Sequence, residues 1–512
     1  MQRATKIVAT IGPASSDRDT LTRMIKAGVN VVRLNFSHGK AQDHIDRATL
    51  VREVADACGV KVAIMADLQG PKIRVGKFEN GKINLENGDK FILDADCTMG
   101  NQERVGLDYK ALPRDLKGDD VLLLNDGLIV LVVERVLGNE IHTVVKIGGE
   151  LSNNKGINRQ GGGLSAPALT AKDMDDIRTA MSFQADYVAV SFPKNATDME
   201  MARQLGNVAG EPFGHKPLMI AKIERAEAIP LLQEILDASD GLMVARGDLG
   251  VEMPPEDVPG LQKSIVHACR QAGKPVVVAT QMLESMISSP TPTRAETSDV
   301  ATAVYDGADA VMLSAESASG AYPVEAVQMM NRIIAASERD LQQGQGLGRL
   351  QRVASLTRPL APVSHRSGDA TDALCAAIHA MAQVLPLAAT VAYTTSGSTT
   401  LRVAHERSWT PVLSLTPDMQ VARMLTLAWG VHSICSQQPQ DVDDMIQRAA
   451  LVAAEQDFQQ QGKPILLVAG TPVGVTGSAN LLRIIWPDEA GMATNAPTTA
   501  GASSRSAINT AR

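Results

Sequence analysis

The chain has 512 residues, of which 44% are hydrophobic, 21% charged and only 3% aromatic, and its formal net charge is −8. That length suffices for about three domains around a large core. The negative charge and the scarcity of aromatic side chains argue against binding to nucleic acids, which requires basic surfaces and stacking aromatic rings.

The five cysteines form no CxxC or other metal-binding spacing. Their odd number does not suggest a complete disulfide framework, so we interpret them as reduced packing residues. The chain begins almost directly with a predicted strand, without an apolar signal segment. Because no apolar run approaches the roughly 18 residues that span a membrane, we expect a cytoplasmic protein without membrane contact.

Eight short apolar runs that each end in polar or charged residues are predicted strands. They cover residues 6–9, 29–32, 62–66, 187–190, 218–221, 242–245, 276–279 and 310–313. Such Val, Ile, Ala and Leu runs are typical of strands buried on both faces. Helical segments separate the later runs, which predicts parallel pairing and a closed (β/α)8 TIM barrel. Catalytic groups in such barrels follow the strands at one face, so the residues from Arg33 to Glu316 are expected to converge there.

The repeat is interrupted after the third run by a β-rich segment. Short apolar runs at 82–85, 121–124, 129–133 and 143–145 alternate there with turn residues. We therefore expect a lid domain at 71–165, inserted into a barrel that is formed by residues 1–70 and 166–341. At the catalytic face, such a lid would exclude water from the reaction.

A polar segment rich in Gly and Gln at 342–348 predicts a flexible linker. Strands are predicted beyond it at 390–393, 412–415, 432–435, 465–469 and 481–485, with helices at 370–383 and 441–456. This alternation favours an open α/β domain at 342–487. The final stretch, 488–512, is rich in Ala, Thr and Ser and is expected to be disordered.

Five strand-end motifs resemble those of pyruvate kinases. They are TKIVATIGPAS (5–15), VRLNFSHG (32–39), DLQGPKIR (67–74), ARGDLGVE (245–252) and ATQMLES (279–285). The motifs are long and in order, and the resemblance runs from about residue 4 to residue 487. It implies that the phosphoryl group of phosphoenolpyruvate is transferred to ADP, giving ATP and enolpyruvate, which then takes up a proton to become pyruvate.

Phosphoryl transfer requires positioning and charge neutralisation. Glu224 and Asp248 are hard oxygen ligands suited to Mg²⁺ or Mn²⁺, and the family places its divalent ion there. Arg33 offers a planar fork to phosphoryl oxygens, while Lys222 is a point charge that, by resemblance, lies between donor and acceptor.

The resemblance places Thr280 beside the methylene carbon of enolpyruvate. A threonine hydroxyl alone is a poor acid, so we assign Thr280 to a proton relay with water and Ser314 or Glu316. The alternative is a strand residue that bonds only to the backbone. The other implied substrate contacts lie in the fourth motif, at Ala245, Arg246, Gly247 and Asp248.

The nucleotide contacts that the resemblance implies come from several segments. They are Pro13, Asn35, His38, Arg74, Lys155 and Asp126, the last of which matches the aspartate at the tip of the family's lid. Two of them have simpler interpretations. His38 could serve simply to stabilise the turn in which it lies, and Lys155 could be a solvated charge on the surface.

The family's monovalent-cation region corresponds to Asn35, Ser37, Asp67, Leu68 and Lys72. Members that need K⁺ carry a glutamate in place of Lys72 and usually a threonine in place of Leu68. A lysine ammonium near Asn35, Ser37 and Asp67 would supply the positive charge internally, so we expect activity without K⁺. The alternative is a Lys72 side chain that points to solvent.

The segment TTSGSTT (394–400) lies between a predicted strand and a helix, a pattern typical of a phosphate nest. Family members bind a sugar phosphate activator at the matching loop. The candidates for a sugar phosphate or AMP effector are therefore Thr395, Ser396, Gly397, Ser398 and Thr400, with simple helix capping as the alternative. Members are usually homotetramers, and a homotetramer is the expectation here.

Two other functions are compatible with the barrel. A lyase or aldolase would use a strand-end lysine such as Lys222 as a Schiff base, which requires a neutral amine. The neighbouring carboxylate of Glu224 argues against this, because it favours the protonated lysine. A catalytically inactive sugar phosphate sensor is the other alternative, although the intact set of Arg33, Lys222 and Asp248 makes it less attractive.

Overall fold

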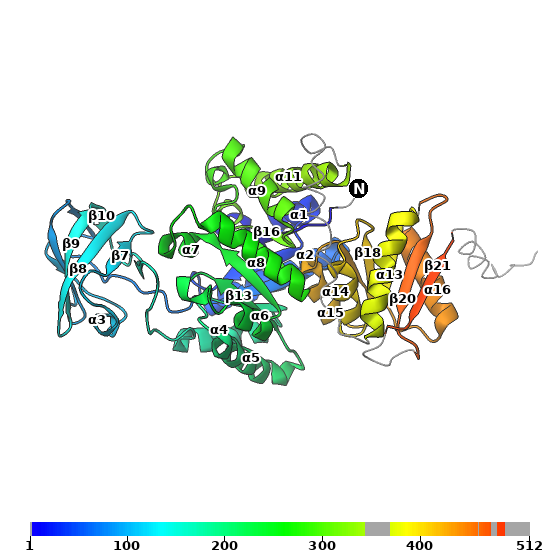
Figure 1. The fold of residues 1–512 in the computed structure, drawn as a ribbon, viewed down its shortest axis with the longest axis horizontal. Helices are drawn as coiled ribbons and strands as arrows, with labels where there is room; N and C mark the ends of the chain where they lie inside the picture. Colours follow the sequence, from blue (N-terminus) through cyan, green and yellow to red (C-terminus); the bar gives the residue numbers. More distant parts are fainter. Residues whose placement is uncertain (1–2, 344–368, 459, 473–478, 487–512) are drawn as a thin grey trace, which may run out of the picture.

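The computed structural model describes residues 3–343, 369–458, 460–472 and 479–486. The β-rich insertion, the barrel and the C-terminal domain lie in a row along the long axis of the molecule (Figure 1). The predicted tail at 488–512 and most of the predicted linker at 342–348 lie outside the described residues.

Eight parallel strands close into a barrel, which confirms the predicted fold class. Their order around the barrel is β1-β16-β15-β14-β13-β12-β3-β2. The strands are β1 (Lys6–Thr10), β2 (Val31–Asn35), β3 (Ala63–Asp67), β12 (Tyr187–Val190), β13 (Leu218–Ile223), β14 (Gly241–Ala245), β15 (Val276–Ala279) and β16 (Ala310–Leu313).

The strand predicted at 29–32 is wrong by two or three residues at each end, since β2 spans Val31–Asn35. Arg33 and Asn35 remain in the ladder, where they pair with Met65 and Asp67 of β3. Because β2 continues through its polar residues, the side chain of Arg33 projects from the barrel itself rather than from a loop.

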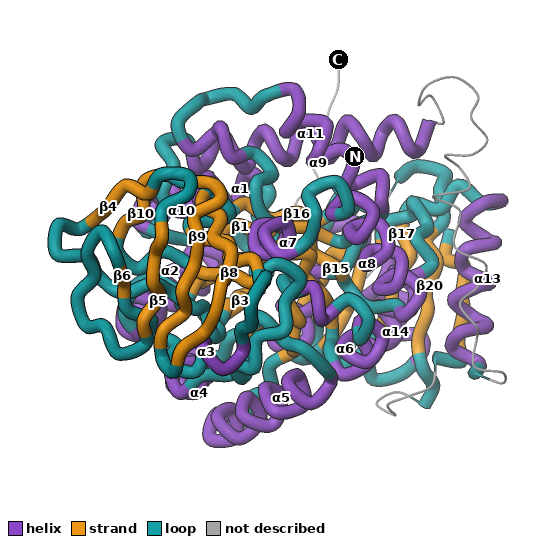
Figure 2. Tube along the Cα trace, turned by 60° about the vertical axis from the view of Figure 1, so that its left-hand side comes forward, coloured by secondary structure: helices purple, strands orange, loops and turns teal. Residues whose placement is uncertain are grey.

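Helices surround the barrel (Figure 2). They are α1 (Arg18–Ala27), α2 (Ala41–Ala57), α4 (Ala171–Ser182), α5 (Ala196–Gly210), α6 (Leu232–Ala238), α7 (Arg246–Glu252), α8 (Val258–Ala272), α9 (Arg294–Asp306), α10 (Ala315–Ala318) and α11 (Pro323–Gln343), with short 3-10 turns η1 (Pro13–Ser15), η2 (Glu211–Phe213), η3 (Ala226–Ala228) and η4 (Glu284–Ile287). Local sequence sets their ends: Thr293 and Glu296 form a capping box at the start of α9, and Gly307 ends that helix with φ +91°.

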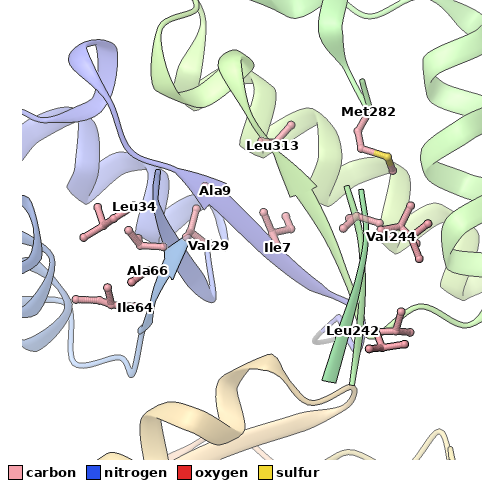
Figure 3. Packing of buried hydrophobic residues seen from close by; sticks show 14 of the residues in the cluster. Ile7, Ala9, Val29, Leu34, Ile64, Ala66, Leu242, Val244, Met282 and Leu313 are labelled. Atoms are coloured by element: carbon pink, nitrogen blue, oxygen red, sulfur yellow. The ribbon is translucent and has the colours of Figure 1, made fainter. Parts of the chain in front are cut away.

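Alternate residues of the barrel strands face two different cores. Ile7, Ala9 and Ile64 point outward and pack under the helices (Figure 3). Residues of the other parity, such as Val8 and Met65, fill the interior together with Leu427 from the C-terminal domain. That domain therefore contributes to packing inside the barrel.

The insertion between β3 and β12 forms its own hydrophobic cluster. It comprises β4 (Lys82–Leu85), β5 (Lys90–Asp94), β6 (Arg104–Val105), α3 (Leu112–Asp115), β7 (Val121–Leu124), β8 (Ile129–Leu137), β9 (Glu140–Ile147), β10 (Gly149–Ser152) and β11 (Ile157–Arg159). A six-stranded sheet has the order β11-β7-β8-β9-β5-β6, and β10 pairs with β4. Its strands lie in front of the barrel in Figure 2.

The C-terminal domain is a five-stranded sheet in the order β19-β18-β17-β20-β21, parallel except for β21. It contains α13 (Ala370–Val384), β17 (Ala389–Tyr393), α14 (Ser398–His405), β18 (Val412–Thr416), α15 (Met419–Met424), η5 (Leu425–Leu427), β19 (Val431–Cys435), α16 (Val442–Glu455), β20 (Ile465–Ala469) and β21 (Leu481–Ile485). Among the helices of the described ranges, none has the length and apolarity needed to cross a membrane.

Candidate active site

Charged side chains converge at the carboxyl ends of neighbouring barrel strands. Lys222 lies in β13, Arg33 in β2, and Asp67 ends β3, while Glu224 directly follows β13. The ammonium of Lys222 contacts Asp67 Oδ1 at 3.1 Å and Glu224 Oε1 at 2.8 Å, and it donates a hydrogen bond to Ser191 Oγ at 2.7 Å. The lysine is therefore fixed by groups from three strand ends.

Arg33 is held from two sides. Its Nε donates to Asp67 Oδ2 at 2.5 Å, and its Nη1 donates to Thr10 Oγ1 at 3.0 Å. Asp67 is fully buried, which opposes its ionisation, but the charges of Arg33 and Lys222 outweigh burial and lower the pKa of Asp67. One buried carboxylate therefore orients both cations that are predicted to meet the phosphoryl group.

The charge state of Lys222 follows from the same contacts. Burial disfavours the ammonium, yet the carboxylates of Asp67 and Glu224 outweigh burial and raise the pKa of Lys222 above its usual value. Burial also raises the pKa of Glu224; Lys222 partly offsets this, and the carboxylate of Asp248 adds repulsion. Lys222 is thus a permanent cation at neutral pH.

Glu224 and Asp248 follow two neighbouring strands of the barrel, β13 and β14. Glu224 Oε2 accepts a hydrogen bond from the Phe192 backbone N–H at 3.0 Å, and Asp248, in the first turn of α7, is about one quarter exposed. The described residues contain no group of three or more His, Cys, Asp or Glu side chains arranged to hold a metal. Two mutually repelling carboxylates nevertheless fit Mg²⁺, which commonly takes one or two protein carboxylates together with substrate phosphates and water.

Thr280 follows β15 in a strained conformation, with φ +76°, which is rare for a β-branched residue. Its carbonyl accepts a hydrogen bond from Arg246 Nη2 at 2.7 Å, and Arg246 also binds Asp299 in a bidentate ion pair. A Cβ on Gly247 would approach Thr280 Cγ2 to 2.8 Å. The guanidinium of Arg246 therefore holds the backbone of Thr280 in place. Gly247, which has no side chain, leaves room for the Thr280 side chain.

Ser314 and Glu316 follow β16. Glu316 is buried, which raises its pKa, and its two carboxylate oxygens accept hydrogen bonds from the backbone N–H groups of Leu283 (3.1 Å) and Ser314 (2.7 Å). Glu316 therefore holds together the loops after β15 and β16.

The residues predicted to bind nucleotide divide between the barrel rim and the insertion. Pro13 and His38 are exposed on the barrel, and the backbone of His38 bonds to Asn35 within its turn. Arg74 Nη1 donates to the Asn154 carbonyl at 3.1 Å, next to Lys155. Asp126 is exposed at the tip of the β7–β8 hairpin.

Lys72 forms its ion pair with Asp248, at 3.3 Å, rather than with Asp67. Asp67 is occupied by Arg33 and Lys222. Leu68 is buried, and Asn35 Oδ1 accepts a bond from the Ser37 backbone N–H. The ammonium of Lys72 therefore lies beside one of the two candidate metal ligands.

The loop after β17 exposes Thr395, Ser396 and Ser398, while Gly397 occupies the start of α14 with φ +88°. No side chain caps α14, so simple capping by Ser or Thr is not observed. Thr400 is buried, and its hydroxyl bonds to Ser414 Oγ at 2.7 Å, which separates it from the other four candidates.

Glu252 connects the insertion to the catalytic loops. Its oxygens accept hydrogen bonds from Asn158 of β11 (3.4 Å) and from the backbone N–H of Ala226 (3.1 Å), two residues beyond Glu224. Its carbonyl accepts a bond from Gly161. Glu252 also ends α7, the helix that carries Asp248. The insertion and both candidate metal ligands are thus linked through one side chain.

Replacing Glu252 with glutamine should remove a pH dependence of stability. Burial raises the pKa of Glu252 from 4.5 to about 7, so the folded protein holds this proton more tightly than the unfolded chain. The contribution of Glu252 to the free energy of unfolding is fully present below pH 4.5. It is lost as the pH rises to about 7, and the loss is on the order of 3 kcal/mol. The melting temperature of Glu252→Gln, measured from pH 5 to 7.5, should decline less with pH than that of the wild type; parallel curves would contradict this role.

Sequence reasoning assigned no role in the phosphoryl site to Thr10, Ser191 or Glu252, and it placed Asp67 only in the cation region. Thr10, Asp67 and Ser191 all lie at the carboxyl ends of barrel strands. The signal that identified Lys222, a polar residue at the end of a predicted strand, would therefore have identified them as well. The role of Glu252 depends on contacts across 26 and 94 residues of chain, which no local pattern reveals.

The chain is similar to known proteins over most of its length. Residues 2–327 match the family described as "Pyruvate kinase, barrel domain", and residues 372–485 match "Pyruvate kinase, alpha/beta domain". The chain is 45% identical to "Pyruvate kinase" of Methylorubrum extorquens over 94% of its own length and 97% of the relative's. It is 42% identical to "Pyruvate kinase II" of Salmonella typhimurium, covering 94% and 98%, and 41% identical to "Pyruvate kinase" of Geobacillus stearothermophilus, covering 94% and 80%.

Proposed function

Because this chain belongs to the pyruvate kinase family and is a phosphotransferase of phosphoenolpyruvate and ADP, we propose that its reaction takes place among Lys222, Arg33, Glu224 and Asp248. The observation that supports this is the convergence of Lys222 and Arg33 on the single buried carboxylate of Asp67. Both cations are thereby held rigidly at one face of the barrel, as charge stabilisation without reorganisation requires.

In the proposed reaction, the bond between phosphorus and the enol oxygen of phosphoenolpyruvate breaks and a bond to the terminal oxygen of ADP forms. Negative charge crowds the donor, the acceptor and the moving group. The ammonium of Lys222 stabilises the charge on the moving group, and the guanidinium of Arg33 orients its oxygens. Ala245 to Asp248 complete the substrate contacts.

Glu224 and Asp248 are proposed to hold Mg²⁺ or Mn²⁺. When bound, the divalent ion would supply charge neutralisation for substrate oxygens. Lys72, paired with Asp248, keeps that carboxylate in place. Lys222, paired with Glu224, does the same on the other side.

Thr280 is proposed to deliver a proton to the methylene carbon of enolpyruvate through water and Ser314. The bond from Arg246 to its carbonyl holds the strained backbone from which this side chain projects. Glu316 contributes by holding the backbone of Ser314. The nucleotide is assigned to Pro13, Asn35, His38 and, across the lid at 71–165, to Arg74, Lys155 and Asp126.

Activity without K⁺ is a further expectation. Lys72 places a positive charge beside Asp248. The other residues assigned to the cation region are Asn35, Ser37, Asp67 and Leu68. Turnover should change less than about tenfold when KCl replaces tetramethylammonium chloride at fixed ionic strength, because the lysine already supplies the charge. A larger stimulation by K⁺ would overturn this assignment.

Regulation and assembly complete the proposal. Thr395, Ser396, Gly397 and Ser398 form the candidate nest for a sugar phosphate or AMP in the C-terminal domain at 342–487, with the uncapped start of α14 as support. Thr400 was also a candidate but faces Ser414. A cytoplasmic homotetramer is proposed from the resemblance to the family.

A lyase or aldolase mechanism is disfavoured by the surroundings of Lys222. Two carboxylates raise the pKa of its amine, whereas a Schiff base forms from the neutral amine. A coupled assay of ATP and pyruvate formation from phosphoenolpyruvate, ADP and Mg²⁺ tests the proposal. Equal amounts of both products, lost when Mg²⁺ is removed, are expected; borohydride trapping of pyruvate on Lys222 without ATP formation would refute it.

A further inference from the structure

Two chain segments join the β-rich insertion to the barrel (Figure 1). Along the outgoing segment, Leu68 packs in the hydrophobic cluster of the barrel and Ile73 in that of the insertion. Along the return segment, Leu164 packs in the cluster of the insertion and Leu169 in that of the barrel. We call the residues between each pair the connecting segments. Any motion of the insertion relative to the barrel must be taken up there.

One buried carboxylate holds the two connecting segments beside each other. Asp173 lies in the first turn of α4 and is fully buried. Its Oδ1 accepts a hydrogen bond at 3.0 Å from the backbone N–H of Gly70, in the outgoing segment. Its Oδ2 accepts bonds from the backbone N–H (2.8 Å) and the hydroxyl (2.6 Å) of Thr170, which comes directly after Leu169. Asp173 thereby joins the place where the chain leaves the barrel to the place where it returns.

Helix capping explains only part of these contacts. The bonds between Asp173 and Thr170 form a capping box, which is common at helix starts, whereas the bond from Gly70 is additional. A carboxylate only accepts hydrogen bonds, so its two oxygens can serve both sets of donors at once. The amino-terminal end of α4 also favours its negative charge. An asparagine would turn an N–H group toward one set of donors and lose that contact.

The backbone that Asp173 holds packs against the surroundings of Lys222. Gly70 has φ +66°, and a Cβ there would lie 2.7 Å from the Cβ of Ser191. Ser191 Oγ donates to the carbonyl of Leu68 at 2.7 Å and accepts from the ammonium of Lys222, also at 2.7 Å. The outgoing segment therefore contacts the hydroxyl that orients this ammonium.

The same segment carries Lys72. The backbone N–H of Lys72 donates to the carbonyl of Gly70 at 3.0 Å, and its ammonium pairs with Asp248 at 3.3 Å. A displacement of Gly70 would therefore disturb a contact of Lys222 and a contact of Asp248 together.

We propose that Asp173 is a positioning residue for phosphoryl transfer. By holding the backbone of Gly70 against Ser191, it keeps Lys222 and Lys72 in place and prevents motion of the lid from displacing them. Asp173 acts through Gly70 and does not itself meet the substrate. The inference rests on the proposed reaction at Lys222, so its test includes a measurement that does not depend on activity.

That measurement is hydrogen exchange of the full chain, followed by mass spectrometry of overlapping peptides that cover residues 66–72. The N–H of Gly70 should be protected in the wild type, because its acceptor is a buried carboxylate. In Asp173→Asn, its exchange should be at least about tenfold faster, the change expected for loss of one hydrogen bond to a charged group. A Gly70 amide that exchanges freely in the wild type would overturn the proposal, even if the asparagine variant did not fold.

Steady-state kinetics separate positioning from simple stabilisation. At saturating ADP and Mg²⁺, kcat of Asp173→Asn should fall about tenfold, because a displaced ammonium stabilises the moving phosphoryl group less. The KM for phosphoenolpyruvate should change less than about threefold, since the lost contribution is to the transition state rather than to the bound substrate. Faster exchange of Gly70 with unchanged kcat would overturn the positioning role. A wild type that forms no ATP would refute the reaction itself, and a protected Gly70 amide would distinguish that result from failure of the contact.

Asp444→Asn is the matched control. Asp444 has the same position in α16, three residues after the residue that caps this helix, and its Oδ2 accepts a bond from the backbone N–H of Gln440 at 2.9 Å. The variant loses a comparable capping contact in the C-terminal domain. It should leave exchange at residues 66–72 unchanged and kcat within about twofold of the wild type, because surface capping contacts affect stability rather than the distant site. Equal losses of kcat in Asp173→Asn and Asp444→Asn would show that Asp173 only caps its helix and would overturn the proposal.

Discussion

Lys222→Met should lower the rate of phosphoryl transfer at least a hundredfold. A unit charge about 4 Å from the moving group, at an effective dielectric near 20, is worth roughly 4 kcal/mol, or on the order of a thousandfold in rate. The ammonium is held by Asp67, Ser191 and Glu224, so no other side chain replaces it. The measurement is ATP formation at saturating phosphoenolpyruvate, ADP and Mg²⁺.

Lys216→Met is the control for that experiment. Lys216 lies six residues earlier and is exposed. Its variant should retain the turnover of the wild type, because the charge is solvated and distant from the candidate active site. If Lys222→Met were folded and within tenfold of the wild type, Lys222 would have no direct part in phosphoryl transfer.

Asp67→Asn should reduce stability by about 3 to 5 kcal/mol, the range for breaking a buried ion pair from one side. Asp67 is fully buried and faces two cations, Arg33 and Lys222. Asparagine keeps the shape but leaves these cations with one carboxylate fewer. Turnover should also fall, since both cations lose the group that orients them. Urea unfolding followed by circular dichroism measures the stability.

Asp175→Asn provides the comparison for an exposed pair. Asp175 pairs with Arg178 on α4, and both side chains are more than two thirds exposed. Such pairs contribute at most about 1 kcal/mol. Because the pKa of Asp67 is lowered from 3.8, its contribution is present above that value and is lost as the pH falls below it. The difference in free energy of unfolding between the wild type and Asp67→Asn should therefore become smaller in acid. A difference that does not change with pH, or a loss of stability equal to that of Asp175→Asn, would contradict the assigned role.

The barrel could be predicted because its physical cause is local. Strands buried on both faces are short apolar runs, and eight of them between helices favour one architecture. The same pattern identified Lys222 and Asp248, since polar residues at strand ends share one face. The carboxyl end of β2 was misplaced because Arg33 and Asn35 were interpreted as following the strand, whereas they pair with β3.

The contacts within the site could not be predicted from local patterns. Lys72 was expected near Asp67 but pairs with Asp248, 176 residues away, because Asp67 is already occupied by Arg33 and Lys222. Arg246 stays a predicted substrate contact, and its guanidinium also binds Asp299 and the carbonyl of Thr280, which are 53 and 34 residues away in the chain. Each outcome depends on competition among partners that are distant in the chain.

The most direct test of a single shared site is a double-mutant cycle on Lys222 and Asp248. Lys222→Met, Asp248→Asn and the double variant are compared with the wild type in kcat/KM for phosphoenolpyruvate at saturating ADP and Mg²⁺. Because groups that act on one transition state lose their effects together, the double variant should be much more active than the product of the two single losses predicts. Losses that simply multiply would show that Lys222 and Asp248 act independently and would contradict the proposed site.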